Sequence, residues 1–339
     1  MGVRRQLGRS MEAALGKERT DQIRKRERQA RKRLALRLAP PPPKPTKRPA
    51  QRRRADATDH PRPPARPLGE PNDRRGGWIP SDAFVPHPTP KLSRHDLLRG
   101  LHELLSPRTY FEIGVNEGSS LTLSRTKSIA VDPEFAVTRA LHCDLDLVKA
   151  KSDDFFARPD AMSHFEGVGV DLAFIDGMHL SEFALRDFIN VERHLSPTGV
   201  TVFDDVLPRN GLEAARVRRT GAWAGDVYKA VEIVARHRPD LLVLLVNTAP
   251  TGTAVVIGAD PSSAVLQDSY ASQVAYLEAA DPQTPPQEYM ARAIAVDPDE
   301  LLASQAWPLI VRARETGDQA LLDEAKSLLQ AIPKLGVTS

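Results

Sequence analysis

Short apolar runs alternate with helical patterns through the middle of the chain. Ser93 precedes leucines at helical spacing and should cap a helix that Pro107 ends. Beyond it, apolar runs predict strands at 109–115, 128–133, 170–176 and 200–205. Because these runs are apolar on both faces and alternate with helices, they indicate a parallel sheet covered on both sides.

Two further patterns complete the predicted sheet. A helical pattern at 180–197, whose apolar face includes Phe188 and Leu195, joins the last two of these strands. Two more apolar runs, at 241–247 and 253–259, are separated by a segment too short for a crossover helix. We therefore predict a doubly wound, mostly parallel α/β fold that ends in an antiparallel hairpin.

The end of the chain, residues 261–339, reads as a helical extension. It contains the pattern of a helical pair joined near 315–318, and Pro308 should kink or break the first of the two helices. This extension could be an appendage, a contact for a homo-oligomer or a lid.

The N-terminal segment differs from the rest in charge. Residues 1–80 hold 23 Lys/Arg and 8 Asp/Glu, a net +15, whereas the remainder holds 24 and 36, a net −12. Because the segment is also rich in proline and poor in large apolar residues, residues 1–76 should form a largely disordered arm, with a helix favoured at 16–38. The arm could be a solubilising tether or a contact for an anionic surface or polymer. The predicted globular domain is then 77–260.

Cys143 is the single cysteine, so the chain can form no internal disulfide and no cysteine-based zinc site. We find no apolar run of membrane-spanning length and no secretory pattern. The expectation is a soluble, cytoplasmic protein.

The loop after the first predicted strand indicates a ligand. Gly114 and Gly118 form a G-x-x-x-G pattern, not the G-x-G-x-x-G of nicotinamide-binding folds. Glu112 precedes them, and an acid pointing into the pocket would repel a diphosphate and favour a cation. Asp132 ends the next strand, where a carboxylate can accept both hydroxyls of a ribose. S-adenosylmethionine (SAM) has a ribose, a positive charge and no diphosphate; the simpler alternatives are a tight turn and a helix cap.

Three carboxylates follow two neighbouring predicted strands. Asp176 ends one strand, Asp204 and Asp205 end the next, and His179 comes three residues after Asp176. Because the ends of parallel strands meet at one edge, these carboxylates would repel one another. A hard divalent cation such as Mg²⁺ would relieve the repulsion. The alternative is a set of helix caps and surface acids.

Four segments in order resemble class I SAM-dependent methyltransferases: YFEIGVNEGSS, AVDPE, DLAFIDGMHLSEFALRDF and PTGVTVFDDVLP. They are most similar to the metal-dependent O-methyltransferases of sugars, polyketide sugars and catechols, over residues 92–258. The resemblance implies a Rossmann-like domain with Asp176, Asp204 and Asp205 as metal ligands. It implies cofactor contacts from Glu112, Gly114, Asn116, Gly118, Ser119 and Asp132, and weaker ones from Ser152 and Asp153.

The resemblance also implies the catalytic groups. In the catechol branch a lysine takes the substrate proton at the position of His179, and a histidine with an ordinary pKa of about 6.5 is a better base near neutrality. We therefore expect His179 and Asp176 to be catalytic, although His179 could instead bind metal or begin a helix. Trp223, Tyr228 and Lys229 could hold the acceptor or simply pack.

These expectations combine into one function and two alternatives. The expected function is SAM- and Mg²⁺-dependent methyl transfer to a hydroxyl, on a sugar of a glycan or glycosylated metabolite. The alternatives are a nucleic-acid methyltransferase that uses the basic arm, and a SAM-binding or glycan-assembly scaffold without turnover.

Overall fold

The structure, a computed structural model, describes residues 84–336. The predictions made for the arm at 1–76 lie outside the described residues. Within the described range, no helix is both long and apolar enough to cross a membrane.

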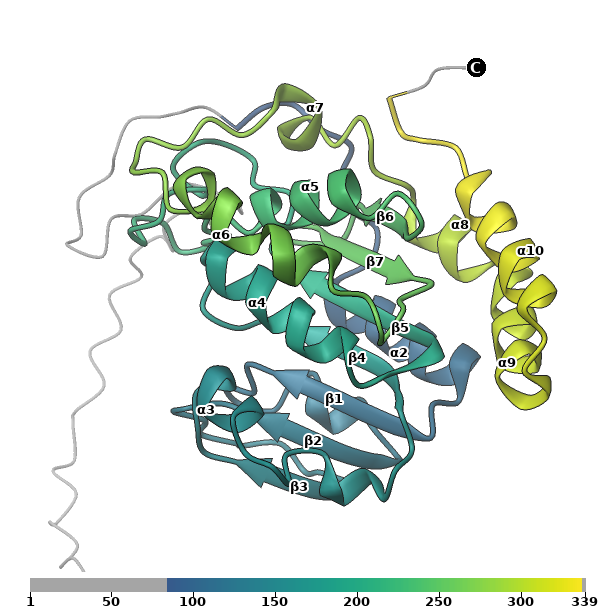
Figure 1. Cartoon of the computed structure of the whole chain (residues 1–339). Helices are drawn as coiled ribbons and strands as arrows, with labels where there is room; N and C mark the ends of the chain where they lie inside the picture. The colour runs from purple at the N-terminus through teal and green to yellow at the C-terminus, as the bar shows by residue number, and fades with distance from the viewer. Residues whose placement is uncertain (1–83, 337–339) are drawn as a thin grey trace, which may run out of the picture. The chain divides into compact units, whose positions relative to one another are not determined.

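In the described residues seven strands form one sheet, in the order β3-β2-β1-β4-β5-β7-β6 (Figure 1). The first five pair in parallel, and β7 is antiparallel to both β5 and β6. This confirms the predicted Rossmann-like sheet with its antiparallel hairpin. The strands are β1 (Thr109–Ile113), β2 (Lys127–Val131), β3 (Asp144–Val148), β4 (Val170–Ile175), β5 (Leu195–Asp204), β6 (Leu242–Val246) and β7 (Thr253–Ile257).

One face of the sheet is covered by α3 (Ser152–Phe156), α4 (Ser181–Glu192), α5 (Tyr228–His237) and α6 (Val265–Leu277). Phe111 of β1, Phe188 of α4 and Val231 of α5 belong to the same buried cluster. The predicted end of α4 was wrong. Leu195 lies in β5, because it pairs with Val170 at the start of β4.

The opposite face is covered by α2 (Arg94–Leu105), α8 (Pro298–Leu302), α9 (Ala306–Thr316) and α10 (Gln319–Gln330). Side chains alternate along β1, so Tyr110 joins this second cluster while Phe111 joins the first. Trp307 and Leu329 are fully buried in the second cluster. The helical prediction for the C-terminal region is confirmed, and α9 and α10 pack on the sheet. The shorter elements are η1 (Leu121–Leu123), η2 (Ser163–Phe165) and α7 (Gln287–Met290).

The helix ends follow local chemistry. Ser93 caps α2 as predicted, accepting a hydrogen bond from the backbone of Asp96 and donating its own backbone N–H to the Asp96 carboxylate. Pro308 does not kink a helix. It is the third residue of α9, where its missing N–H costs no intrahelical bond, and the break falls before it, between α8 and α9.

The sheet topology determines where a site can form. β1 lies between β2 and β4, so the connections turn to opposite sides at this point. In such sheets ligands bind outside the carboxyl ends of the strands at the reversal. Those ends carry the loops in which the candidate residues occur.

Candidate active site

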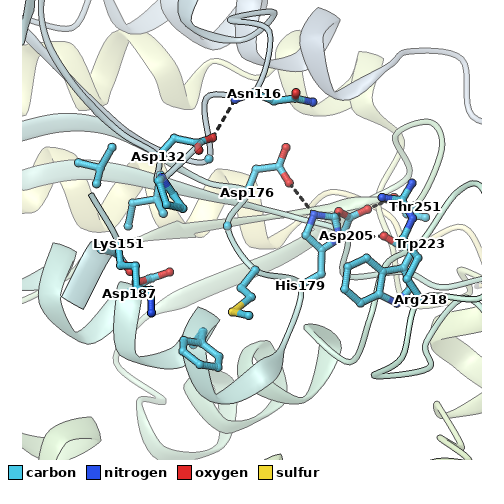
Figure 2. A pocket seen from close by; sticks show the side chains of 18 of the residues that line it. Asn116, Asp132, Lys151, Asp176, His179, Asp187, Asp205, Arg218, Trp223 and Thr251 are labelled. Atoms are coloured by element: carbon cyan, nitrogen blue, oxygen red, sulfur yellow. Dashed lines mark hydrogen bonds and ion pairs between the residues drawn. The ribbon is translucent and has the colours of Figure 1, made fainter. Parts of the chain in front are cut away.

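A cavity of about 630 Å³ opens at the carboxyl ends of β1, β2, β4 and β5. Figure 2 shows Asn116, Asp132 and Lys151 on one side of it and His179 and Trp223 on the other. Its volume is typical of a site for a small molecule or cofactor. Many of the cofactor and metal residues predicted from the sequence therefore line one continuous space.

The loop after β1 is built around close backbone contacts. Gly114 has φ +90°, and a Cβ at this position would lie 1.8 Å from the Asp176 carbonyl oxygen. Glycine is therefore needed where this loop meets the end of β4. Asp132 Oδ2 accepts hydrogen bonds from the backbone of Val115 (2.8 Å) and Asn116 (2.9 Å).

These bonds change the role predicted for Asp132. One of its two oxygens already accepts two backbone N–H groups, so it cannot freely receive two ribose hydroxyls. Oδ1 accepts a single bond, from the backbone of Glu134 at 2.6 Å, and keeps a lone pair. Asp132 thus both anchors the glycine loop and can offer one oxygen to a ligand.

Glu112 does not point into the cavity, contrary to the prediction. It is fully buried on the same face of β1 as Tyr110, and accepts hydrogen bonds from the hydroxyls of Tyr110 (2.6 Å) and Ser120 (2.7 Å). Burial raises its pKa from an ordinary 4.5 to about 8. Gly118 and Ser119 also lie off the cavity wall, because the chain turns away after Asn116.

The start of α3 supplies another part of the wall. Ser152 and Asp153 line the cavity as predicted, and Asp153 is paired with Arg186 at 2.7 Å. Asp187 of α4, which the sequence did not single out, also lines it although the residue is only 3% exposed. Burial raises the pKa of Asp187 to about 7, against the effect of a hydrogen bond with Ser152.

On the other side of the cavity, Asp176, His179 and Asp205 offer ligand atoms that all lie within 4.8 Å of one another. His179 lies between the carboxylates: Nε2 is 3.3 Å from Asp176 Oδ1, and Nδ1 is 2.9 Å from Asp205 Oδ2. The Thr251 hydroxyl donates to the other Asp205 oxygen. His179 and Asp205 both have left-handed backbones, φ +58° and +62°. Such strain in non-glycine residues gathers at functional sites.

The environment of His179 is strongly electronegative. Burial lowers its pKa, but Asp205 and Asp176 more than offset this and raise the pKa to about 11. The expected ordinary value near 6.5 is therefore wrong for this arrangement. Without a bound metal ion, His179 is an imidazolium that contacts both carboxylates and offsets one of their two negative charges.

Asp204 does not join this group, although the sequence predicted it as a third ligand. Its side chain is 2% exposed and forms an ion pair with Arg94, whose Nη1 lies 2.5 Å from Asp204 Oδ2. Burial and the neighbouring Asp205 and Asp176 raise the pKa of Asp204, whereas Arg94 lowers it. We take Asp204 as ionised because the guanidinium is in direct contact.

The loop from 206 to 226 encloses the cluster. The ring of Trp223 stacks on that of His179, with centroids 5.0 Å apart and planes 10° apart, and its carbonyl lies 2.8 Å from Nδ1. Gly225 allows this approach, since a Cβ there would be 1.8 Å from the His179 carbonyl oxygen. Tyr228 and Lys229 are buried and do not line the cavity, so they do not hold an acceptor there.

The residues present fit a hard divalent cation. Asp176 and Asp205 offer carboxylate oxygens from adjoining strand ends, which is the donor chemistry of Mg²⁺. Asp204 Oδ2 is buried against the Arg94 guanidinium, so these donors do not include Asp204.

Several cavity residues carry no local sequence signal. Arg94 looks like an ordinary first-turn helix residue, and Thr251 lies in a hairpin turn. Met178 also lines the cavity, and its side chain is 58% exposed. Its position two residues after Asp176 was the only feature of the sequence that could have indicated its place in the site.

Several solved structures of other proteins are similar to about half of this chain. Among solved structures, the cofactor-bound Rv0187 from MTB is 16% identical, with a TM-score of 0.38 over 51% of this chain and 84% of its own. TomG from Streptomyces achromogenes, an O-methyltransferase involved in tomaymycin synthesis and solved with SAM, is 18% identical, with a TM-score of 0.36 over 49% of this chain and 80% of its own. An O-methyltransferase from Bacillus cereus, solved with S-adenosylhomocysteine (SAH), is 15% identical, with a TM-score of 0.34 over 50% and 84%.

The sequence matches no curated protein. One family, described as a methyltransferase domain, matches residues 111–206. This segment holds Gly114, Asp132, Asp176, His179 and Asp205, so most of the cavity wall lies in the part of the chain that matches a methyltransferase domain.

Proposed function

We propose that this protein is a SAM-dependent O-methyltransferase whose acceptor hydroxyl binds beside Asp176, His179 and Asp205. The observation that carries the proposal is the single cavity that joins Asp132 and the glycine loop to this cluster. A cofactor held at the first place brings its methyl group toward an acceptor held at the second. Such positioning supplies much of the acceleration in group transfer.

The cofactor half of the cavity suits SAM. Asp132 Oδ1 keeps a lone pair for a ribose hydroxyl, and the wall at Met178 and Phe183 is apolar. Asp153 and Asp187 add acidic groups beside Lys151, so this part of the wall is not the cluster of basic groups that a diphosphate needs. A sulfonium cation is therefore favoured over a dinucleotide.

His179 is the proposed general base, and its contacts define which nitrogen acts. Nδ1 lies between two acceptors, Asp205 Oδ2 at 2.9 Å and the Trp223 carbonyl at 2.8 Å. It therefore carries its hydrogen in both charge states, which leaves Nε2 to accept the acceptor proton. Asp205 and Trp223 hold the ring in place while the proton moves.

Asp176 and Asp205 would hold a divalent cation, which we propose to be Mg²⁺. When bound, the ion would lower the pKa of an acceptor hydroxyl and oppose protonation of His179. The finer proposal, that the hydroxyl belongs to a sugar, is supported by the residue type at Asp205. The catechol type has Asn at this position, and the resemblance associates Asp with the sugar branch.

The test is labelled methyl transfer by the full chain. SAM carrying a labelled methyl group is offered with sugar and glycan acceptors or with RNA and DNA, each with Mg²⁺ and with excess chelator. The expected product is a sugar methyl ether, identified by mass spectrometry and absent in chelator. Full transfer in chelator would refute the metal, and transfer to a nucleobase would refute the acceptor. SAH binding without any transfer would support a scaffold instead.

A further inference from the structure

Arg94 brings a positive charge into the acidic cluster from outside the matched segment 111–206. Its Nη1 is 2.5 Å from Asp204 Oδ2 and its Nη2 is 4.0 Å from Asp176 Oδ2. The Arg94 side chain is 27% exposed, and it lines the cavity. The guanidinium therefore contacts Asp204 and lies near Asp176, one of the two proposed metal ligands.

The backbone holds Arg94 in place. Ala249 accepts a hydrogen bond from the Arg94 N–H at 3.3 Å, and its own N–H donates to the Leu92 carbonyl at 2.9 Å. The capping box at Ser93 fixes the first turn of α2. Ala249 belongs to the same turn as Thr251, which donates to Asp205. The start of α2 and the Asp205 side of the cluster are thus tied to one loop.

Arg94 already supplies a positive charge beside the carboxylates of Asp204 and Asp176. A divalent cation on Asp176 and Asp205 would lie near the Arg94 charge, with Asp204 already committed to the guanidinium. In a partly buried site such a like-charge contact is weakly screened and costs affinity.

We propose that Arg94 is a built-in counter-cation that reserves Asp204 and weakens divalent-metal binding at the active site. The proposal rests on the metal site of the proposed function. It makes Arg94 a residue that sets metal affinity, rather than a metal ligand or a substrate contact. Asp204 then serves chiefly to hold Arg94, not the ion.

The test is calorimetric titration of the SAH-bound full chain with Mn²⁺. Arg94→Met frees Asp204 and removes the opposing charge, so Mn²⁺ should bind about tenfold or more tightly than in the wild type. Arg99→Met is the matched control, because Arg99 lies on the same helix and pairs with Asp96 at the surface. It should leave the Mn²⁺ affinity unchanged. Thermal shift provides a second readout, with Mn²⁺ raising the Tm of Arg94→Met more than that of the wild type.

The double variant Arg94→Met/Asp204→Asn separates competition from ligation. The double variant removes the Asp204 charge together with Arg94, so it can be tested even if Arg94→Met alone does not fold. If Arg94 reserves Asp204, the double variant should bind Mn²⁺ within about threefold of the wild type. A tenfold loss would make Asp204 a ligand and overturn the proposal. So would an Arg94→Met affinity equal to or weaker than the wild type. Absence of Mn²⁺ binding in every variant would overturn the metal site itself, and this inference with it.

Discussion

The two ring nitrogens of His179 have different surroundings. Nδ1 is enclosed by Asp205 and the Trp223 carbonyl, whereas Nε2 has Asp176 at 3.3 Å and the cavity beside it. A residue with one anchored and one available nitrogen suits proton transfer. The two acids also make the ring cationic when no other cation is present, so its state depends on what occupies the cavity.

Replacing His179 should therefore impair chemistry more than binding. We expect His179→Ala to lower the rate of methyl transfer by about 10²–10⁴-fold, as for a lost acid–base group. SAH affinity should change little, because the cofactor half of the cavity is built from Gly114 and Asp132. Added imidazole should restore part of the rate. An unchanged rate, or a loss explained by weaker SAH binding alone, would contradict the assignment.

The buried Glu112 should make the stability of the fold depend on pH. Burial raises its pKa from 4.5 to about 8, so the folded state holds this proton more tightly than the unfolded chain. Its contribution to the unfolding free energy is complete below pH 4.5 and is lost as the pH rises toward 8. The slope is at most about 1.4 kcal/mol per pH unit.

Glu112→Gln should remove this slope. Its unfolding free energy should therefore rise relative to that of the wild type as the pH increases from about 4.5 to about 8. Chemical denaturation of both proteins from pH 5 to 8 measures the difference. Glu117→Gln is the control, since Glu117 is exposed in the same loop. Parallel curves for Glu112→Gln and wild type would show that Glu112 is ionised in the folded state.

At the scale of elements, the cavity depends on two close backbone contacts. Gly114 lets the loop after β1 reach the end of β4, and Gly225 lets loop 206–226 reach His179. In each case a Cβ would overlap a carbonyl oxygen. The proposed cofactor and acceptor halves of the cavity are therefore held together by main-chain contacts as well as by side chains.

Gly225→Ala should move this loop away from His179. We expect a large loss of methyl transfer with SAH binding retained, because Trp223 would no longer hold Nδ1. Gly167→Ala is the matched control, since Gly167 also has positive φ but no atom lies within 4 Å of an added Cβ. In both variants alanine must adopt a positive φ, which should lower the unfolding free energy by about 1 kcal/mol. Equal effects on transfer would show that the approach to His179 is unimportant.

At the scale of the molecule, helices from both ends of the described residues pack on one face of the sheet. α2 from the start, and α9 and α10 from the end, share one buried cluster with Tyr110. Removing residues 304–339 should uncover this face and make the protein unfold or aggregate. Removing residues 1–76 should leave the Tm and SAH binding unchanged, because that composition cannot contribute a core. A stable, cofactor-binding product of the first deletion would mean that α9 and α10 are dispensable.

The sequence by itself determined six of the seven described strands, the hairpin, and the edge of the sheet at which Asp132, Asp176 and Asp205 lie, but not β3. These follow from periodicity and from the rule that parallel strands end on one side, which need only local patterns. It could not show which charges pair. Arg94 reaches Asp204, Trp223 stacks on His179, and Glu112 turns into the core. Arg94 and Trp223 lie far from their partners in the chain, and the face toward which Glu112 points depends on how β1 is placed in the sheet, so only the tertiary structure decided these contacts.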